Sequence, residues 1–183
     1  MKPFQNKRLF VFLNAIEVIG IFIVLLMASS FEFIFHELPC PLCLLQRVGM
    51  VGICIGLLLN LRFKAHPAHY SLTLLSALLT GFVALRQVAL HVVPGTGSYG
   101  DPIFGYHLYT WSFILSMCVL IYTSIVLAFG AQYDGKHLQT TSWKTAVNFC
   151  FALVAAIIIV NVASTYAECG LKACPDNPTS YFG

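Results

Sequence analysis

Charged residues are scarce in this sequence. Only 9% of its 183 residues are Asp, Glu, Lys or Arg, whereas 58% are hydrophobic and the mean hydropathy is +0.83. Soluble globular domains are about one quarter charged, so this balance excludes an ordinary soluble domain. The few Lys and Arg residues form no basic stripe interleaved with aromatics, which argues against nucleic-acid binding despite a net charge of +3. Most of the chain is therefore expected to lie in lipid.

Long polar segments are lacking as well. A membrane-spanning helix needs about 20 mostly apolar residues. The loops between the apolar stretches are too short for a separate domain, so residues 1–183 are predicted to form a single all-α membrane domain that ends in a tail at 168–183. The five stretches that meet the length requirement are approximately residues 9–31, 44–61, 70–93, 106–129 and 146–167.

The Lys and Arg residues are unevenly distributed over the loops and ends. Loops on the cytoplasmic side of a membrane carry an excess of Lys and Arg. A cytoplasmic N-terminus places seven of the ten on that side, and five spans then place the C-terminal tail on the outer side. The seven are Lys2, Lys7, Arg8, Arg62, Lys64, Lys136 and Lys144. Most acidic residues then fall on the outer side, namely Glu32, Glu37, Asp101, Glu168 and Asp176.

The seven cysteines fall into two groups. Cys54, Cys118 and Cys150 lie inside apolar runs, where a cysteine behaves as a small hydrophobe. The other four lie at the edges of apolar runs, on the predicted outer side, where water and partner proteins have access. These edge cysteines are Cys40, Cys43, Cys169 and Cys174.

The first edge pair forms a Cys-Pro-Leu-Cys motif at the start of the second span. Pro41 suits the first turn of a helix, and Cys43 would then lie where free N–H groups and the helix dipole favour a thiolate. Arg47 is one turn further along the same helix face, where it could stabilise that thiolate or a quinone oxygen that gains negative charge. The alternatives are a snorkelling arginine and either a static disulfide or half of a zinc site. Redox use is favoured, because a bridge over two residues is readily exchanged.

This motif at 40–43, followed by Arg47, resembles the DsbB-type disulfide-bond-formation proteins. The hydrophobic plan of the first four spans resembles that family too, with Arg86 and Gln87 near the outer end of the third span and Trp111 opening the fourth. The resemblance implies a four-helix transmembrane bundle in the bacterial inner membrane, here with a fifth helix added. It also implies an enzyme, a thiol:quinone oxidoreductase that reoxidises a periplasmic thioredoxin-like (DsbA-type) partner and passes the electrons to ubiquinone or menaquinone.

The second edge pair departs from the family pattern. The family usually carries a second cysteine pair between its third and fourth spans, but the loop at 94–105 contains no cysteine. The tail contains Cys169 and Cys174, and the fifth span brings them to the predicted outer face. We therefore predict two disulfides, Cys40–Cys43 and Cys169–Cys174, with the tail pair relaying electrons from the partner to the first pair. The alternative is that the tail pair only staples the tail.

The resemblance assigns the quinone to Cys43 and Arg47. Arg86 and His91, near the outer end of the third span, are further candidates for quinone binding because an ionisable residue inside a span usually serves a function. No metal site is expected. The aromatic residues around the loop at 94–105 are predicted to form an interfacial belt, and a wall of a cofactor cavity is the alternative.

Two other functions remain open. A quinone reductase resembling vitamin-K-epoxide reductase would share the chemistry, but its quinone-facing pair lies on a late helix, whereas here the order is reversed. A metal-binding membrane protein would use all four edge cysteines as thiolate ligands, which an oxidising compartment disfavours.

Overall fold

The computed structural model describes residues 7–34, 38–93, 95, 102–130, 133, 141–172, 174 and 181. Within them the chain forms no strand and five α-helices, each long and apolar enough to cross a membrane. The all-α membrane class predicted from the sequence is thereby confirmed. The helices are α1 (Lys7–Ile34), α2 (Pro41–Arg62), α3 (Pro67–His91), α4 (Leu108–Leu127) and α5 (Thr141–Cys169).

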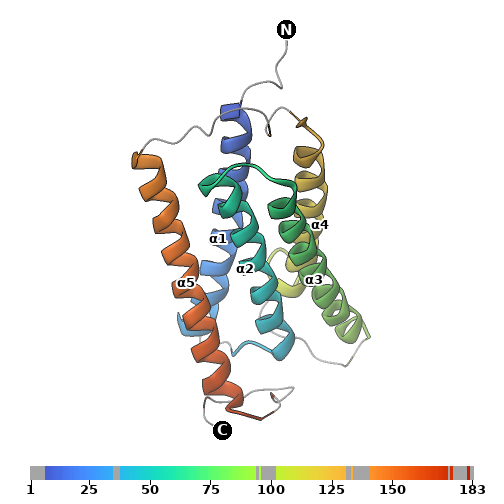
Figure 1. The fold of residues 1–183 in the computed structure, drawn as a ribbon. Helices are drawn as coiled ribbons and strands as arrows, with labels where there is room; N and C mark the ends of the chain where they lie inside the picture. The colour runs from blue at the N-terminus through green and yellow to red at the C-terminus, as the bar shows by residue number, and fades with distance from the viewer. Residues whose placement is uncertain are drawn as a thin grey trace.

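The helices run up and down beside one another (Figure 1). Helix α2 packs against α1, α3 and α5, and α3 also packs against α4. Helix α1 begins at one end of the bundle and α5 ends at the other, and the start of α2 lies at the same end as the end of α5 (Figure 1). This arrangement brings the start of α2, with the first cysteine pair, and the end of α5, with the second, to one end of the bundle.

Helix α2 begins earlier than the predicted span at 44–61. Cys40 caps the helix with extended backbone, Pro41 occupies its first turn, and the Cys40 sulfur accepts a hydrogen bond from the Cys43 backbone N–H. A proline suits this position because its missing N–H would have no partner within the helix. The motif is therefore part of the helix end itself.

Three glycines on α2 allow α3 to approach closely. A Cβ atom on Gly49 would lie 2.1 Å from the Thr80 hydroxyl oxygen, and one on Gly56 would lie 2.7 Å from the backbone oxygen of His69. Gly52, between them, meets the Ser76 side chain in the same way. Since side chains are absent along this line, the backbones come together, and the contact continues towards the start of α2.

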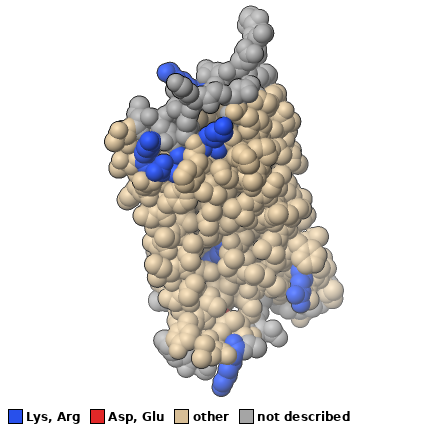
Figure 2. Space-filling model, in the orientation of Figure 1, with Lys and Arg blue, Asp and Glu red and all other residues tan. Residues whose placement is uncertain are grey.

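Lys and Arg side chains gather at the end of the bundle where α1 and α5 begin (Figure 2). Five charged residues of the orientation argument lie outside the described residues, namely Lys2, Glu37, Asp101, Lys136 and Asp176. Glu32 and Glu168 are described, and both are buried, with exposed fractions of 1% and 5%. The sequence suggested outward-facing carboxylates, but helix packing encloses these two.

Candidate functional site

The first cysteine pair lies at the buried start of α2. Cys40 is 3% exposed, Cys43 is half-buried, and both are free thiols. The Cys43 N–H donates to the Cys40 sulfur over 3.2 Å. In place of the predicted Cys40–Cys43 disulfide, the structure thus holds the reduced form of the pair. The disulfide form stays a prediction, because a redox pair must pass through both states.

Gln87 on α3 contacts both sulfurs. Its Nε2 donates to Cys40 Sγ over 3.1 Å and to Cys43 Sγ over 3.4 Å. Its Oε1 accepts from Gln46 Nε2 over 2.6 Å, which fixes the orientation of the amide. Gln87 is fully buried, and hydrogen-bond donors aimed at sulfur stabilise a thiolate. The sequence placed Gln87 near the outer end of the third span but gave it no role.

The two sulfurs of this pair differ in acidity. The side-chain hydrogen bond between the two thiols, together with burial, raises the pKa of the Cys40 thiol well above its usual range, although the Cys43 backbone N–H acts in the opposite direction. Cys40 therefore keeps its proton at neutral pH. Cys43, in the first turn of α2, is the better candidate for the attacking thiolate.

A cavity of about 490 Å³ opens beside the two sulfurs. Its wall is mostly apolar and comes from α1, α2, α4 and the segment before α4. Both cysteines of the pair and Arg47 are part of this wall, so a thiol and a cation face the same apolar space.

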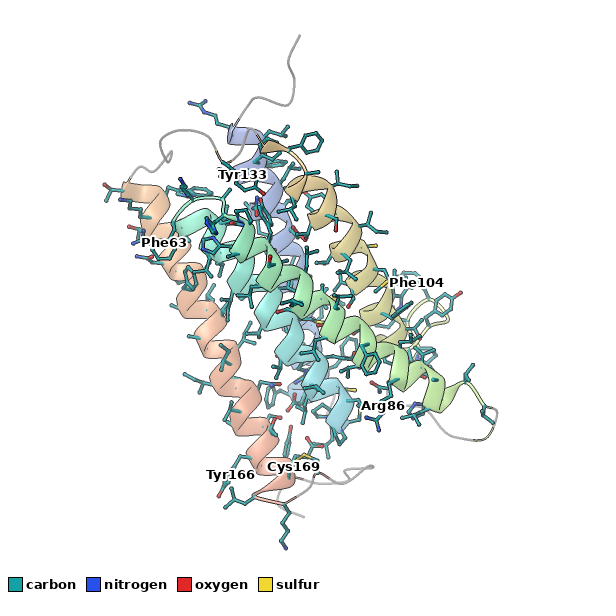
Figure 3. All side chains as sticks on the ribbon, turned by 45° about the vertical axis from the view of Figure 1, so that its right-hand side comes forward. Phe63, Arg86, Phe104, Tyr133, Tyr166 and Cys169 are labelled. Atoms are coloured by element: carbon teal, nitrogen blue, oxygen red, sulfur yellow. A yellow bond between two sulfur atoms is a disulfide. The ribbon has the colours of Figure 1, made fainter. Side chains whose placement is uncertain are left out.

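A tight turn closes one side of the cavity. Ile103 and Tyr106 exchange backbone hydrogen bonds of 2.9 and 3.1 Å, and Trp111 Nε1 donates to the Ile103 carbonyl oxygen over 3.0 Å. Between them Phe104 and Gly105 adopt left-handed backbone, with φ of 50° and 83°. Phe104, labelled in Figure 3, and Trp111 both contribute to the cavity wall. The aromatics near this loop therefore enclose a cavity, the alternative to a purely interfacial belt.

Arg47 is held by α1. Its guanidinium pairs with the carboxylate of Glu32, and Nη2 donates to the Ala28 backbone oxygen over 3.0 Å. With 8% of its surface exposed, Arg47 is buried rather than snorkelling to water. This burial does not fit the alternative of an arginine that snorkels to water.

The two other candidates on α3 lie apart from the cavity wall. Arg86 (Figure 3) is exposed and does not line the cavity. His91 does not line it either, but its Nδ1 donates to the Gln87 carbonyl oxygen over 2.8 Å and its ring stacks on Tyr109, which does. The structure thus connects His91, and not Arg86, to residues that reach the cavity and the sulfurs.

The second pair is joined by a disulfide between Cys169 and Cys174, with the two Cα atoms 4.5 Å apart. Cys169 is the last residue of α5 (Figure 3), and Gly170 turns the chain with a φ of 60°. The next residue, Leu171, is 95% exposed. A four-thiolate metal site, the alternative considered above, would need both of these sulfurs as free thiolates.

Comparison with protein families adds a match to "Disulfide bond formation protein DsbB" over residues 8–100, or 93 of the 183 residues. This chain belongs to the DsbB family. The DsbB match covers α1, α2 and α3, with Cys40, Cys43 and Arg47, and ends before α4 and the tail pair. Searches of curated proteins and of solved structures found no match.

Membership of the DsbB family, together with five apolar helices, makes this a multi-pass membrane protein of disulfide-bond formation. The family comprises oxidoreductases that interact with a thiol partner. The matched part contains the Cys-Pro-Leu-Cys motif and its α3 partner Gln87, whereas the disulfide at Cys169–Cys174 belongs to the unmatched part of the chain.

Proposed function

We propose that this DsbB-family protein is a thiol:quinone oxidoreductase of the bacterial inner membrane. It takes electrons from a periplasmic thioredoxin-like dithiol protein of the DsbA type and passes them to ubiquinone or menaquinone. The observation that carries this proposal is the apolar cavity that Cys43 and Arg47 line together.

The cavity fits the ring of a quinone. Small-molecule sites are concave, mostly apolar and about 300–1,000 Å³ in volume, with a few polar groups that fix orientation. The cavity of about 490 Å³ has these properties, and Arg47 is its cation. A quinone bound there would accept two electrons and two protons.

The residues at the cavity divide the chemistry among them. Cys43 attacks as the thiolate, with Gln87 and the start of α2 stabilising its charge. Cys40 keeps its proton until it closes the disulfide with Cys43. Arg47 stabilises negative charge on an oxygen at the cavity, and the apolar wall strengthens that interaction by excluding water.

The tail pair serves as the relay. The partner's dithiol reduces the Cys169–Cys174 disulfide, and the resulting dithiol is reoxidised by the Cys40–Cys43 disulfide, with each exchange moving two electrons and two protons. The exposed Leu171 beside the tail disulfide offers the partner an apolar contact.

The orientation of the helix bundle in the membrane follows from the positions of its Lys and Arg residues. Four described cations, Arg8, Arg62, Lys64 and Lys144, lie at the starts of α1 and α5 and around the α2–α3 loop, at the end away from both cysteine pairs. We assign that end to the cytoplasm because cytoplasmic loops are enriched in Lys and Arg. Both pairs then face the periplasm.

The relay is tested with Cys174→Ala and two electron donors. With a reduced thioredoxin-like protein as donor, quinone reduction is expected to fall by at least about a hundredfold, as for loss of a covalent catalytic group. With dithiothreitol, which is small enough to reach Cys40 and Cys43 directly, the rate should stay within about threefold of wild type.

Cys150→Ala, which removes a half-buried thiol of α5, is the matched control and should leave both rates unchanged. Undiminished turnover of Cys174→Ala with the protein donor would rule out the relay. Failure of the wild-type protein to reduce quinone with either donor would rule out a quinone as the electron acceptor.

A further inference from the structure

Glu32, near the end of α1, is the most enclosed of the described carboxylates, with 1% of its surface exposed. One oxygen pairs with the Arg47 guanidinium. The other accepts hydrogen bonds from Ser164 Oγ on α5 and, over 2.7 Å, from the hydroxyl of Tyr181 in the tail. A single carboxylate thus joins α1, α2, α5 and the tail.

Glu32 and Ala28 hold Arg47 from one face of α1. They are four residues apart, so both contacts come from adjacent turns of the helix, and together they bind both terminal nitrogens of the guanidinium. Arg47 lines the cavity, but Glu32 does not. Arg47 is thus the cavity-lining side chain that Glu32 holds directly.

The other side of Glu32 faces the part of the chain that lies outside the family match. Ser164 and Glu168 are one turn apart on α5, and Cys169 follows directly. Glu168 is 5% exposed, and its carboxyl oxygens have no hydrogen-bond partner among the described residues. A second buried carboxyl group therefore lies one turn beyond the Ser164 contact of Glu32 and directly before the tail disulfide.

We propose that Glu32 is the positioning residue for Arg47 and that, through Ser164 and Tyr181, it couples the tail carrying the second cysteine pair to the cavity. This inference rests on the proposed function, in which Arg47 faces the quinone. A movement of the tail that withdraws the Tyr181 hydroxyl changes the hydrogen bonding of Glu32 and thereby the hold on Arg47. The tail is then part of the quinone-facing site as well as an electron relay.

The main test measures the quinone KM and kcat with dithiothreitol as donor, so that the tail disulfide is not needed for electron transfer. Glu32→Leu frees the guanidinium and should raise the quinone KM about tenfold, with kcat changed less than about threefold, since a hydrogen bond to a charged group is lost. Glu32→Gln keeps the shape and an acceptor oxygen and should restore the KM to within about threefold of wild type.

A second measurement follows the alkylation of Cys43 as a function of pH without quinone. Glu32→Gln leaves Arg47 in place but removes the anion that offsets it, so half-maximal alkylation should move to lower pH by about half a unit to one unit. The matched control is Glu17, another carboxylate on α1, which accepts from Thr123 and lies about 22 Å further along the helix. Glu17→Leu and Glu17→Gln should leave the KM and the alkylation profile unchanged.

The coupling to the tail is tested with Tyr181→Phe, which removes one hydrogen bond to Glu32. The quinone KM with dithiothreitol should rise about twofold to threefold, whereas Tyr166→Phe, at an exposed position of α5, should have no effect. An unchanged KM for Tyr181→Phe would overturn the coupling.

The outcomes separate this inference from the proposed function. If Arg47→Leu raises the quinone KM but Glu32→Leu does not, Glu32 is not a positioning residue. If Arg47→Leu has no effect either, the assignment of Arg47 to the quinone is wrong. Should Glu32→Leu fail to fold, the Glu32→Gln alkylation profile decides, and an unshifted profile overturns the inference.

Discussion

The two cysteine pairs lie at the same end of one bundle but in different surroundings. Cys40 and Cys43 are part of the capped start of α2, and a buried amide from Gln87 donates to both sulfurs. Cys169 and Cys174 follow the end of α5, joined by a disulfide and next to an exposed Leu171. Hydrogen bonding and packing, rather than spacing alone, therefore decide whether a cysteine pair lies against a cavity or at the end of a helix.

The largest expected effect is a difference between Cys40 and Cys43, the inner pair, in their rates of reaction with a maleimide at neutral pH. Cys43 should be labelled at least about a hundredfold faster than Cys40, because only the thiolate reacts and the raised pKa of Cys40 keeps that thiol protonated. Mass spectrometry of labelled peptides over time measures both rates. Equal rates would remove the proposed division of roles.

Cys169 and Cys174, the outer pair, provide the internal control for the same experiment. Cys169 and Cys174 should remain unlabelled until a reductant opens their disulfide. Labelling of either residue in untreated protein would contradict a disulfide between Cys169 and Cys174.

Gln87→Leu removes the amide that donates to the sulfurs of Cys40 and Cys43, and it should leave the disulfide of the tail unchanged. Loss of the two hydrogen bonds to sulfur is expected to reduce the rate of quinone reduction about tenfold with either donor, and to slow Cys43 alkylation at neutral pH. A stopped-flow assay at 25 °C measures the first effect. Ser71→Ala, at an exposed position of the same helix, is the control, and an equal loss there would point to a general effect on α3.

Gly56→Ala should reduce the rate of quinone reduction less than Gln87→Leu does, because it acts on Cys40 and Cys43 only through a shift of α3. The added methyl group would meet the His69 backbone, which cannot rotate away, so α3 must shift relative to α2 at a cost of about 1–3 kcal/mol. The melting temperature should fall, and the rate of quinone reduction should fall about threefold as Gln87 moves from the sulfurs.

Gly20→Ala is the matched control on α1, where no atom lies within 4 Å of the new methyl group. There the substitution should be neutral or stabilising by about 0.5–1 kcal/mol, because alanine favours a helix. A drop in melting temperature as large as that of Gly56→Ala would contradict the close approach of α2 and α3.

Much of the fold follows from the sequence, because a span is a local property. About 20 apolar residues in a row identify a membrane helix whatever its neighbours are. The position of Pro41 also indicated that the motif lies in the first turn of α2, as the structure has it. The Arg47 side chain was placed on the face of Cys43 by helical spacing, and both residues line the cavity.

The partners of these residues could not be predicted in the same way. Gln87 and Glu32 are distant from the motif in sequence, and each meets it only after helices have packed at one particular rotation and depth. Hydrophobic spans are apolar on all sides, so their sequence hardly specifies which face turns inwards. Glu32 was predicted only to lie on the outer side, and packing made it the buried partner of Arg47.

Five apolar helices and two cysteine pairs at the edges of the spans can be read directly from this sequence, since hydropathy and spacing are local properties. The surroundings of each pair depend on how the helices pack. The close approach of α2 and α3 brings Gln87 to the inner sulfurs, and the packing of α1 and α5 encloses Arg47 with Glu32. Those contacts depend on how helices rotate against one another, which no single span encodes.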